Sequence, residues 1–370
     1  MTAFVLFYGR GGESAVERRL DAVRVAIAAS VLRRAGDAGF APVIAVTTDG
    51  DGSRAFAAAG AAVEATGTAP FHLGNELARL VRERALERVC VIGAGAGALL
   101  TADELRGVRR DLEASEALVL SNNYYSADLV GFTPASALGA IALPATDNPL
   151  PRLLHQQAGL PNRQLERSAA TLLDVDTPAD ATVLVRHAAC PPELRALETW
   201  ERELGTRIDG IMSVVTTPDQ ELLVAGRVGA PVWTYLESQT ACRVRMLAEE
   251  RGMQAAGRDA AGSARTALGF LYERTGPVEF FERMSELGDA MLFDSRVLFA
   301  HLGWHPSAPE RFASDLLDAD AISHEPLAAF TRAARDAAVP VLLGGHTLVS
   351  GVLWTMVEAA WSGHPEPVDR

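Results

Sequence analysis

The chain has 370 residues, more than one typical hydrophobic core accommodates, which predicts two domains or one enlarged α/β domain. A formal net charge of −13 argues against a nucleic-acid surface, because phosphate backbones bind to concentrated positive charge. All 34 basic residues are Arg, so chemistry that needs a lysine amine is excluded. An anionic small molecule would have to bind to a local cluster of Arg, to backbone N–H groups or to a metal.

Cysteine usage and hydropathy indicate a cytoplasmic protein. Cys90, Cys190 and Cys242 are widely spaced, which is typical neither of a disulfide framework nor of a zinc site. The first ten residues lack the basic and apolar regions of a signal peptide. The apolar stretch 338–361 is interrupted by proline, glycine, histidine and glutamate, so we expect a buried core helix and no membrane partner.

Short apolar runs alternate with longer amphipathic segments from residue 3 to residue 93. This alternation predicts a parallel sheet covered by helices on both faces. Ligands of such sheets bind at the carboxyl ends of the strands. The expected strands are 3–7, 42–48, 61–65 and 89–93, and the expected helices are 15–38, 53–59 and 73–86.

The pattern changes after Thr101, and we place the end of the first domain at residue 187. A helix to about Ala114 is expected first, then a strand at 117–121 and a loop that leads into another strand near residue 129. A helix is expected to begin near Asp147. The segment "ATLLDVDTPADATVL" then predicts a strand, an acidic turn and a helix with Pro178 in its first turn.

Residues 188–370 have apolar positions at helical spacing and predict a mainly α-helical domain of unassigned role. Strands are expected only at "GIMSVVTT", residues 210–217, and at "ELLVAG", residues 221–226. The predicted fold class is therefore α/β, with a mostly parallel Rossmann-like sheet in 1–187, followed by the helical domain.

Four stretches of the first half carry a resemblance to a known family: "VTTD", "LGNELARL", "VIGAGAGALLTADEL" and "LLDVDTPADATVL". In this order they resemble nucleotidyltransferases of the glycosyltransferase-A type, and within them 2-phospho-L-lactate and molybdenum cofactor guanylyltransferases. The resemblance covers about half of the chain. It implies a sheet of the nucleotide-diphospho-sugar transferase type.

The resemblance also implies a reaction. An acceptor phosphate attacks the α-phosphorus of a nucleoside triphosphate and pyrophosphate leaves, with Mg²⁺ or Mn²⁺ held by carboxylates. It assigns the catalytic and metal-binding roles to Asp174 and Asp176. Alternate residues of an extended segment share one side, so both carboxylates would point the same way. The alternative is that Asp176 or Thr177 caps the helix that Pro178 begins.

The turn Gly93–Gly97 has no carboxylate where the family holds a metal-binding aspartate. Gly93, Gly95 and Gly97 could bring backbone N–H groups close to a phosphate. A tight strand-to-helix turn without a ligand explains the same residues.

The amino-terminal loop offers a second phosphate grip through Gly9, Arg10, Gly11 and Arg18. A solvated helix face with i,i+4 ion pairs would look the same in sequence. Asn75 is expected to contact a base or to cap the helix that it precedes.

A polar, aromatic segment supplies the residues expected on the acceptor side. Amides recognise the edges of bases and sugars and tyrosine rings stack, so a ligand wall is one interpretation. A turn stabilised by Asn side chains is the other. The acceptor-side candidates are Asn122, Asn123, Tyr124 and Asp128, and Asp147 is a further acidic candidate with a possible capping role.

These observations lead to a nucleotidyltransferase-like protein that binds a nucleotide and a small phosphorylated acceptor through residues 1–187. The helical half would supply a lid, a homodimer surface or acceptor specificity. One alternative is a glycosyltransferase that uses a nucleotide sugar. The other is a non-catalytic protein that binds a nucleotide or metabolite in a degenerate site, suggested by the missing aspartate and the absence of lysine.

Overall fold

A computed structural model describes residues 1–67, 70–253 and 256–362. Contacts between residues divide the chain into two compact units. The first consists of Met1–Gly12 and Asp21–Asp174, and the second of Glu13–Leu20 and Val175–Arg370. The expected boundary between domains at residue 187 stays a prediction. Within the described ranges, no helix is both long enough and apolar enough to cross a membrane.

The first unit is built on a seven-stranded sheet in the order β3-β2-β1-β4-β6-β5-β7. All neighbouring strands are parallel except β6, which is antiparallel to both β4 and β5. The predicted α/β fold class with a mostly parallel sheet is thereby confirmed. The strands are β1 (Thr2–Phe7), β2 (Val43–Val46), β3 (Ala62–Glu64), β4 (Arg88–Gly93), β5 (Leu118–Ser121), β6 (Leu129–Thr133) and β7 (Asn162–Gln164).

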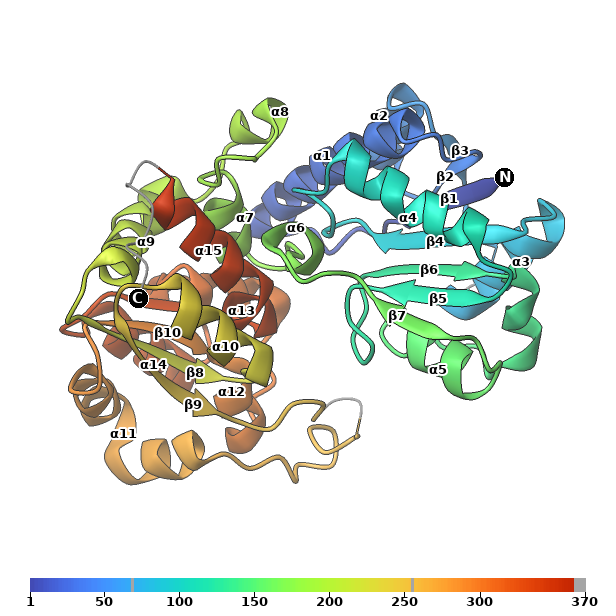
Figure 1. The fold of residues 1–370 in the computed structure, drawn as a ribbon. Helices are drawn as coiled ribbons and strands as arrows, with labels where there is room; N and C mark the ends of the chain where they lie inside the picture. The colour runs from blue at the N-terminus through green and yellow to red at the C-terminus, as the bar shows by residue number, and fades with distance from the viewer. Residues whose placement is uncertain (68–69, 254–255, 363–370) are drawn as a thin grey trace. The chain divides into compact units, whose positions relative to one another are not determined.

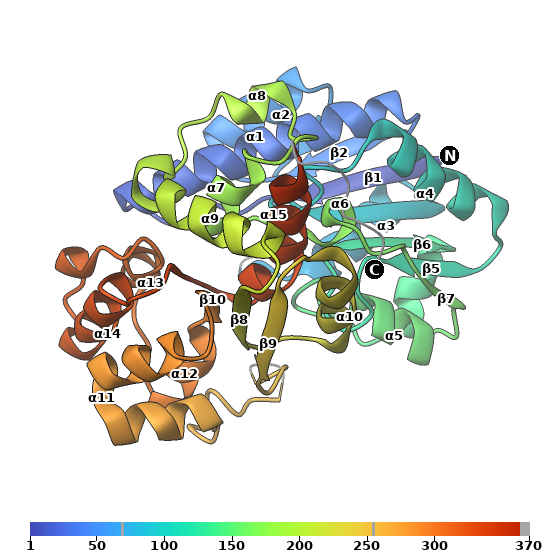
Figure 2. The ribbon, with the colours of Figure 1, turned by 60° about the vertical axis from the view of Figure 1, so that its left-hand side comes forward.

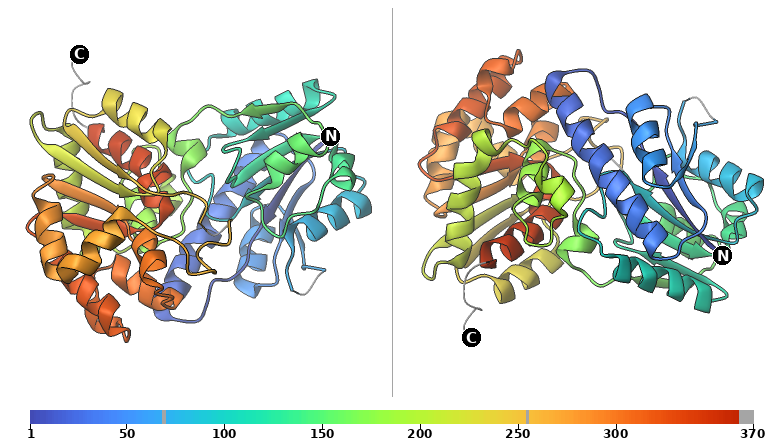
Figure 3. Two further views of the ribbon diagram at one scale, coloured as in Figure 1. Left: turned by 90° about the horizontal axis from the view of Figure 1, so that it is seen from below. Right: turned by 90° about the horizontal axis from the view of Figure 1, so that it is seen from above.

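Both faces of this sheet are covered, which explains its continuous apolar strands. Val5 and Val91 point to one face and pack against the apolar stripes of α3 and α5, including Leu77 and Leu154. Helices α1 and α4 lie over the other face (Figures 1 and 3). The helices are α1 (Ala15–Asp37), α2 (Gly50–Ala58), α3 (Leu73–Glu83), α4 (Ala102–Ala114), the 3₁₀ turn η1 (Ala135–Ala140), α5 (Leu150–Gln156) and α6 (Ala169–Leu172).

Two details of the first unit differ from the expectations. The segment expected as a strand before the acidic turn forms the short helix α6, and only Asp174 makes an isolated β-bridge. The edge strand β7 was not predicted, because its three residues are polar or charged and two of them are exposed.

The second unit contains a four-stranded parallel sheet in the order β11-β10-β8-β9, which the sequence analysis did not predict. Helices outnumber strands in this unit, as expected, but they flank a sheet. Only the expected strand at 221–226 is confirmed. The strands are β8 (Glu221–Gly226), β9 (Arg243–Ala248), β10 (Ala290–Asp294) and β11 (Val341–Gly344).

The missed strands β10 and β11 are short buried apolar runs, which sequence periodicity cannot distinguish from buried helix segments. The missed strand β9 is an edge strand that contains two arginines and has no buried residue. Residues 338–361, expected as one core helix, contain β11 and α15. Conversely, the strand expected at 210–217 is the end of helix α9. Its Ile208, Ile211 and Val215 are buried at helical spacing.

Helices cover both faces of this second sheet. Leu223 and Phe293 share a core with α11, α12, α13 and α14, and α9 and α15 lie on the opposite side of the strands from α11 (Figure 2). The helices are α7 (Pro178–Leu184), α8 (Pro192–Arg195), α9 (Glu201–Thr216), α10 (Ala230–Gln239), α11 (Ala267–Ser285), α12 (Arg296–Leu302), α13 (Ala308–Asp315), η2 (Ala319–Ala321), α14 (Glu325–Arg335), η3 (His346–Val349) and α15 (Gly351–Trp361).

The strand order reverses direction once within the second sheet. From β8 the chain continues to β9 on one side, and from β10 it continues to β11 on the other. Loops that leave β8 and β10 therefore diverge at the carboxyl ends of these strands, the position where open α/β sheets bind ligands.

Candidate active site

The carboxyl ends of β1, β2, β4 and β5 meet at one edge of the first sheet, because these strands run in the same direction. The antiparallel strand β6 begins at this edge, so the residue before it, Asp128, lies beside the end of β4. The backbone N–H of Gly93 donates to the carbonyl of Asp128 at 3.1 Å. Parallel strand ends thus bring together residues that are distant in sequence.

The turn Gly93–Gly97, here called the glycine turn, packs onto the core. Gly97 has a φ of +76°, and a Cβ at this position would lie 2.9 Å from Ile92 Cδ1. Gly95 and Gly97 are buried, and the N–H of Ala96 donates to the carbonyl of Gly93 at 3.3 Å. Close packing and a left-handed conformation therefore account for Gly97 without a ligand.

Two acidic residues reach the glycine turn from other segments. Asp147 Oδ2 lies 3.8 Å from the position that a Cβ on Gly93 would occupy, so its carboxylate adjoins the start of the turn. Asp174 pairs with Ala96 in an isolated antiparallel bridge, which brings a second aspartate to the same turn. The turn has no carboxylate of its own, but the tertiary structure brings two acidic residues to it.

Asp176 exposes its side chain and belongs to the start of α7, where its N–H donates to Asp180 Oδ2 at 3.0 Å. Thr177 is the N-cap of this helix and forms a reciprocal capping box with Asp180. Of the two capping alternatives, Thr177 is the residue that caps. Burial, together with the charge of Asp176, raises the pKa of Asp180 to about 7.

The amino-terminal loop holds an internal carboxylate. The N–H of Gly11 donates to both carboxylate oxygens of Asp21, at 3.2 and 3.1 Å. Burial raises the pKa of Asp21, although Arg24 and Arg10 lie near enough to oppose this. Sequence reasoning missed Asp21, which lies inside α1 with no motif around it.

The remaining residues of this loop differ in their surroundings. Gly9 is exposed, and a Cβ on it would meet no atom within 4 Å. Arg10 is exposed and lies near Asp21 and Tyr8. Burial is the main reason that the pKa of the Tyr8 hydroxyl is raised. Arg18 donates to the backbone carbonyl of Glu13 through its guanidinium. Of the predicted phosphate ligands, Arg10 and Gly11 therefore lie together at the carboxyl end of β1.

Asn75 is exposed in the first turn of α3, and its backbone N–H donates to Nδ1 of the N-cap residue His72 at 3.3 Å. Asn75 itself does not cap the helix. The preceding N–H groups of Leu73 and Gly74 donate to the carbonyls of Ala145 and Pro144. The backbone N–H groups of Leu73, Gly74 and Asn75 thus all have acceptors within the protein, and the Asn75 side chain faces solvent.

Asn122 is buried and organises the loop between β5 and β6. Its Oδ1 accepts from the N–H groups of Asp128 and Leu129, at 3.1 and 3.2 Å. Its Nδ2 donates to Asp128 Oδ2 at 3.1 Å and to the carbonyl of Thr171 at 3.0 Å. All four hydrogen-bonding positions of this amide are occupied, so Asn122 shapes the loop as the turn interpretation expects.

The other acceptor-side candidates form the exposed part of this loop. Asn123 Oδ1 accepts from the N–H of Tyr125 at 3.1 Å, an Asn-stabilised turn. The ring of Tyr124 contacts Tyr125 at 4.9 Å and His155 at 5.9 Å between centroids, both edge-on. Tyr124 and Tyr125 therefore form an aromatic corner at the carboxyl edge of β5.

The acidic residues at the glycine turn are of the kind that bind Mg²⁺ or Mn²⁺. Among the residues that the structure describes, no three His, Cys, Asp or Glu side chains gather closely enough to hold a metal. Mg²⁺ is usually bound by one or two carboxylates together with waters and substrate phosphates. Asp147 and Asp174 are the residues that would hold it.

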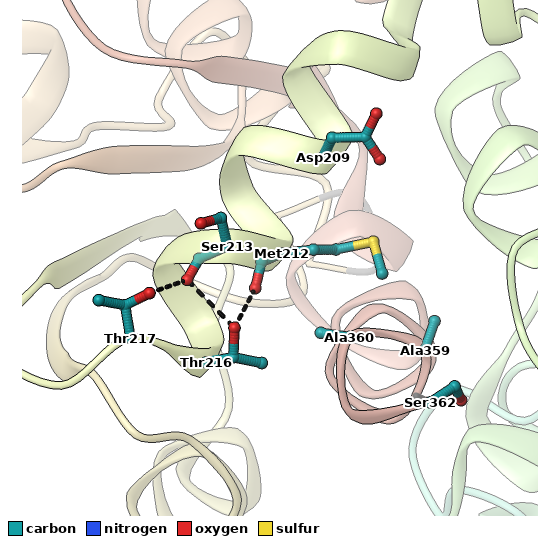
Figure 4. A pocket seen from close by; sticks show the side chains of 8 residues that line it. All are labelled: Asp209, Met212, Ser213, Thr216, Thr217, Ala359, Ala360 and Ser362. Carbon is teal, nitrogen blue, oxygen red and sulfur yellow. Dashed lines mark hydrogen bonds between the residues drawn. The ribbon is translucent and has the colours of Figure 1, made fainter. Parts of the chain in front are cut away.

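A hollow of about 400 Å³ lies elsewhere, between the ends of α9 and α15 in the second unit (Figure 4). The hydroxyl of Thr217 donates to the carbonyl of Ser213 at 2.7 Å, and Thr216 donates to helix carbonyls in the same way. Its lining residues are Asp209, Met212, Ser213, Thr216, Thr217, Ala359, Ala360 and Ser362. Because these hydroxyls already donate to carbonyls of their own helix, we do not place the active site here.

No protein-family model and no curated protein matches the sequence. Several solved structures resemble the chain remotely. One is described as a candidate nucleotide-diphospho-sugar transferase from Desulfovibrio desulfuricans; it is 18% identical, with a TM-score of 0.40 over 55% of this chain and 95% of that one.

Two further solved structures are of named synthetases or transferases. A CMP:2-keto-3-deoxy-manno-octonic acid synthetase in complex with CTP is 15% identical, with a TM-score of 0.35 over 48% of this chain and 94% of its own. A cytidylyltransferase from Leptospira borgpetersenii is 13% identical, with a TM-score of 0.37 over 50% and 83%.

Proposed function

We propose that the first unit is a nucleotidyltransferase-like domain that transfers a nucleoside monophosphate from a triphosphate to a small phosphorylated acceptor. The observation that carries this proposal is the arrival of Asp147 and Asp174 at the glycine turn. Asp147 Oδ2 lies 3.8 Å from the Cβ position of Gly93, and Asp174 pairs with Ala96. Carboxylates beside a turn at the carboxyl edge of a parallel sheet suit a site for a metal–phosphate complex.

In the proposed reaction, an oxygen of the acceptor phosphate forms a bond to the α-phosphorus. The bond between this phosphorus and the bridging oxygen to the β-phosphate breaks, and pyrophosphate leaves with the electron pair. A divalent cation, when bound, neutralises charge on the transferring group. Asp147 and Asp174 would hold this cation, and the exposed Arg10 would pair with phosphate oxygens at the end of β1.

The aromatic corner and Asp128 are assigned to the acceptor side under this proposal. Tyr124 lies edge-on to Tyr125 and His155, so the corner offers ring faces for stacking. Asn122 has a supporting role, because its hydrogen bonds to Asp128 and Leu129 keep the loop in place.

One observation favours a second candidate function, a non-catalytic domain that binds a nucleotide or a phosphorylated metabolite. The N–H of Gly11, which a triphosphate would use, already donates to the Asp21 carboxylate. An anion on this loop must displace Asp21 or bind beside it. A domain that had lost its reaction could retain such an internal contact.

Calorimetric titration of the full chain with GTP, CTP, ATP and UTP, with and without Mg²⁺ or Mn²⁺, tests the proposal. Binding of one triphosphate that requires the metal would support a transferase and identify the donor. Binding without any metal dependence would favour the non-catalytic candidate. No binding of any of the four would overturn the transferase proposal and leave the non-catalytic candidate with a phosphorylated metabolite as its ligand.

A further inference from the structure

The four parallel strands of the second sheet each end beside a charged or ionisable residue. Arg227 directly follows β8, and Asp294 is the last residue of β10. Arg251 follows β9 after Glu249 and Glu250, and His346 comes shortly after β11. Because the strands are parallel, their carboxyl ends place these four residues at one edge, where the strand order reverses between β8 and β10.

Arg227 and Asp294 join the two central strand ends. Arg227 Nε and Nη2 donate to the two carboxylate oxygens at 2.6 and 3.0 Å, and the Arg227 N–H donates at 3.2 Å. Burial opposes ionisation of Asp294, but the Arg227 guanidinium holds its pKa below the usual range. Both groups of this pair are therefore charged.

The pair is fitted tightly into the fold, yet the arginine retains donor capacity. A Cβ on Gly226 would lie 2.4 Å from Asp294 Cβ, so only glycine permits this approach of β8 to β10. Arg227 Nη1 makes no hydrogen bond to the described residues, and 19% of the Arg227 side chain remains exposed. One edge of the guanidinium is thus available to a ligand.

His346 presents a second donor at the same edge. Its Nε2 lies 3.5 Å from Arg251 Nη2, and its Nδ1 is buried without a partner among the described residues. Burial and the nearby Arg227 lower the pKa of His346 to about 4, so the ring is neutral near pH 7. Because Nε2 faces a guanidinium donor, we place the proton on Nδ1. Nδ1–H is then a buried donor that lacks an acceptor.

The loop between β8 and α10 completes the surroundings. Its sequence, Gly226-Arg227-Val228-Gly229, leads directly into the ten-residue helix α10. A Cβ on Gly229 would lie 2.8 Å from Arg251 Nη1, so this arginine lies against the start of the helix. A helix start, a partly used guanidinium and an unpartnered imidazole N–H all favour negative charge.

We propose that the carboxyl edge between β8 and β10 is a second ligand site, in which Arg227 and His346 bind the phosphate group of a small phosphorylated metabolite. Phosphate oxygens would accept from Arg227 Nη1 and from His346 Nδ1, which satisfies the buried donor. The tetrahedral anion suits donors that come from different strand ends. This site lies wholly in the second unit and is independent of the function proposed for the first.

The test uses the full chain and inorganic phosphate as the probe, with binding measured by calorimetry at neutral pH. The decisive variant is His346→Leu, which removes both ring nitrogens. His346→Asn is the matched control, because its amide nitrogen can take the place of Nδ1. Arg243→Gln is the control for a general loss of positive charge, because Arg243 is exposed at the amino end of β9, away from the proposed site.

The wild type is expected to bind phosphate, and His346→Leu to weaken this binding at least about tenfold, as expected for the loss of a hydrogen bond to a charged group. His346→Asn should stay within about threefold of the wild type, and Arg243→Gln should bind phosphate as the wild type does. If His346 had only a structural role, His346→Leu would remove an unpartnered donor and leave phosphate binding unchanged. That result, or no binding of phosphate by the wild type, would overturn the proposal.

Discussion

The backbone of Asp174 pairs with Ala96 in an isolated antiparallel bridge. This single contact connects the last residue of the first unit with the turn after β4. It brings an aspartate to a turn made only of glycine and alanine, and Asp147 arrives at the same turn beside Gly93. The two acidic residues thereby become candidates for one shared role.

We expect Asp147→Asn and Asp174→Asn each to weaken metal-dependent triphosphate binding at least about tenfold, because an amide cannot replace the carboxylate charge beside a cation. In Asp147→Asn, the new amide oxygen can still accept from the N–H of Asn148, so the melting temperature should change little. Calorimetric titration with the preferred triphosphate and Mg²⁺ measures the effect.

Asp103→Asn is the matched control for these variants, since Asp103 is an acidic residue that exposes 87% of its side chain at the start of α4. It should bind as the wild type does. Equal binding by all three variants and the wild type would exclude Asp147 and Asp174 as metal ligands.

Gly97→Ala should destabilise the first unit by about 2 kcal/mol or more, because it adds a clash in the core to a left-handed conformation. The new Cβ would lie 2.9 Å from Ile92 Cδ1 at a φ of +76°. Gly93→Ala is the comparison: among the described residues its Cβ would meet Asp147 Oδ2 alone, at 3.8 Å, so about 1 kcal/mol or less is expected. Urea denaturation measures both, and equal losses would contradict a packing role for Gly97.

Asn122→Ala should cost about 2–4 kcal/mol, because it leaves the buried N–H of Leu129, the partly buried N–H of Asp128 and the carbonyl of Thr171 without their partner. Asn123→Ala, one position along, loses a single bond to the N–H of Tyr125 in an exposed loop and should cost about 1 kcal/mol or less. Urea denaturation compares the pair. A small loss in Asn122→Ala would mean that the loop is held by other contacts.

We expect Asp180 to lower the free energy of unfolding as the pH rises. Its pKa is raised to about 7 in the folded chain, chiefly by burial, whereas the unfolded side chain has its ordinary value near 4. Between these two values the folded state binds more protons than the unfolded state. The contribution of Asp180 to stability is therefore fully present below about pH 4 and is lost as the pH rises through about 7.

Asp180→Asn tests this dependence, because its amide oxygen can still accept from Asp176, Thr177 and Thr347. Free energies of unfolding at about pH 5 and about pH 8 should show a smaller fall in the variant than in the wild type. An unchanged difference between the two pH values would show that Asp180 does not titrate in this range.

The sequence by itself determined much of the first unit. Alternating apolar runs and amphipathic segments predicted the parallel strands β1 to β4 and their helices, because each pattern is local and repeats at its own period. The helix start after Asp176 was also readable, since Pro178 and a nearby Thr form a local capping signal.

The tertiary structure alone decided which residues meet. Asp147 and Asp174 reach the glycine turn, Asp21 reaches Gly11 and His346 reaches Arg251 through contacts between segments that no local pattern links. The sequence did not predict the second sheet for a related reason. Its strands β10 and β11 are continuous apolar runs buried on both faces, and only their pairing with other strands distinguishes them from buried helices.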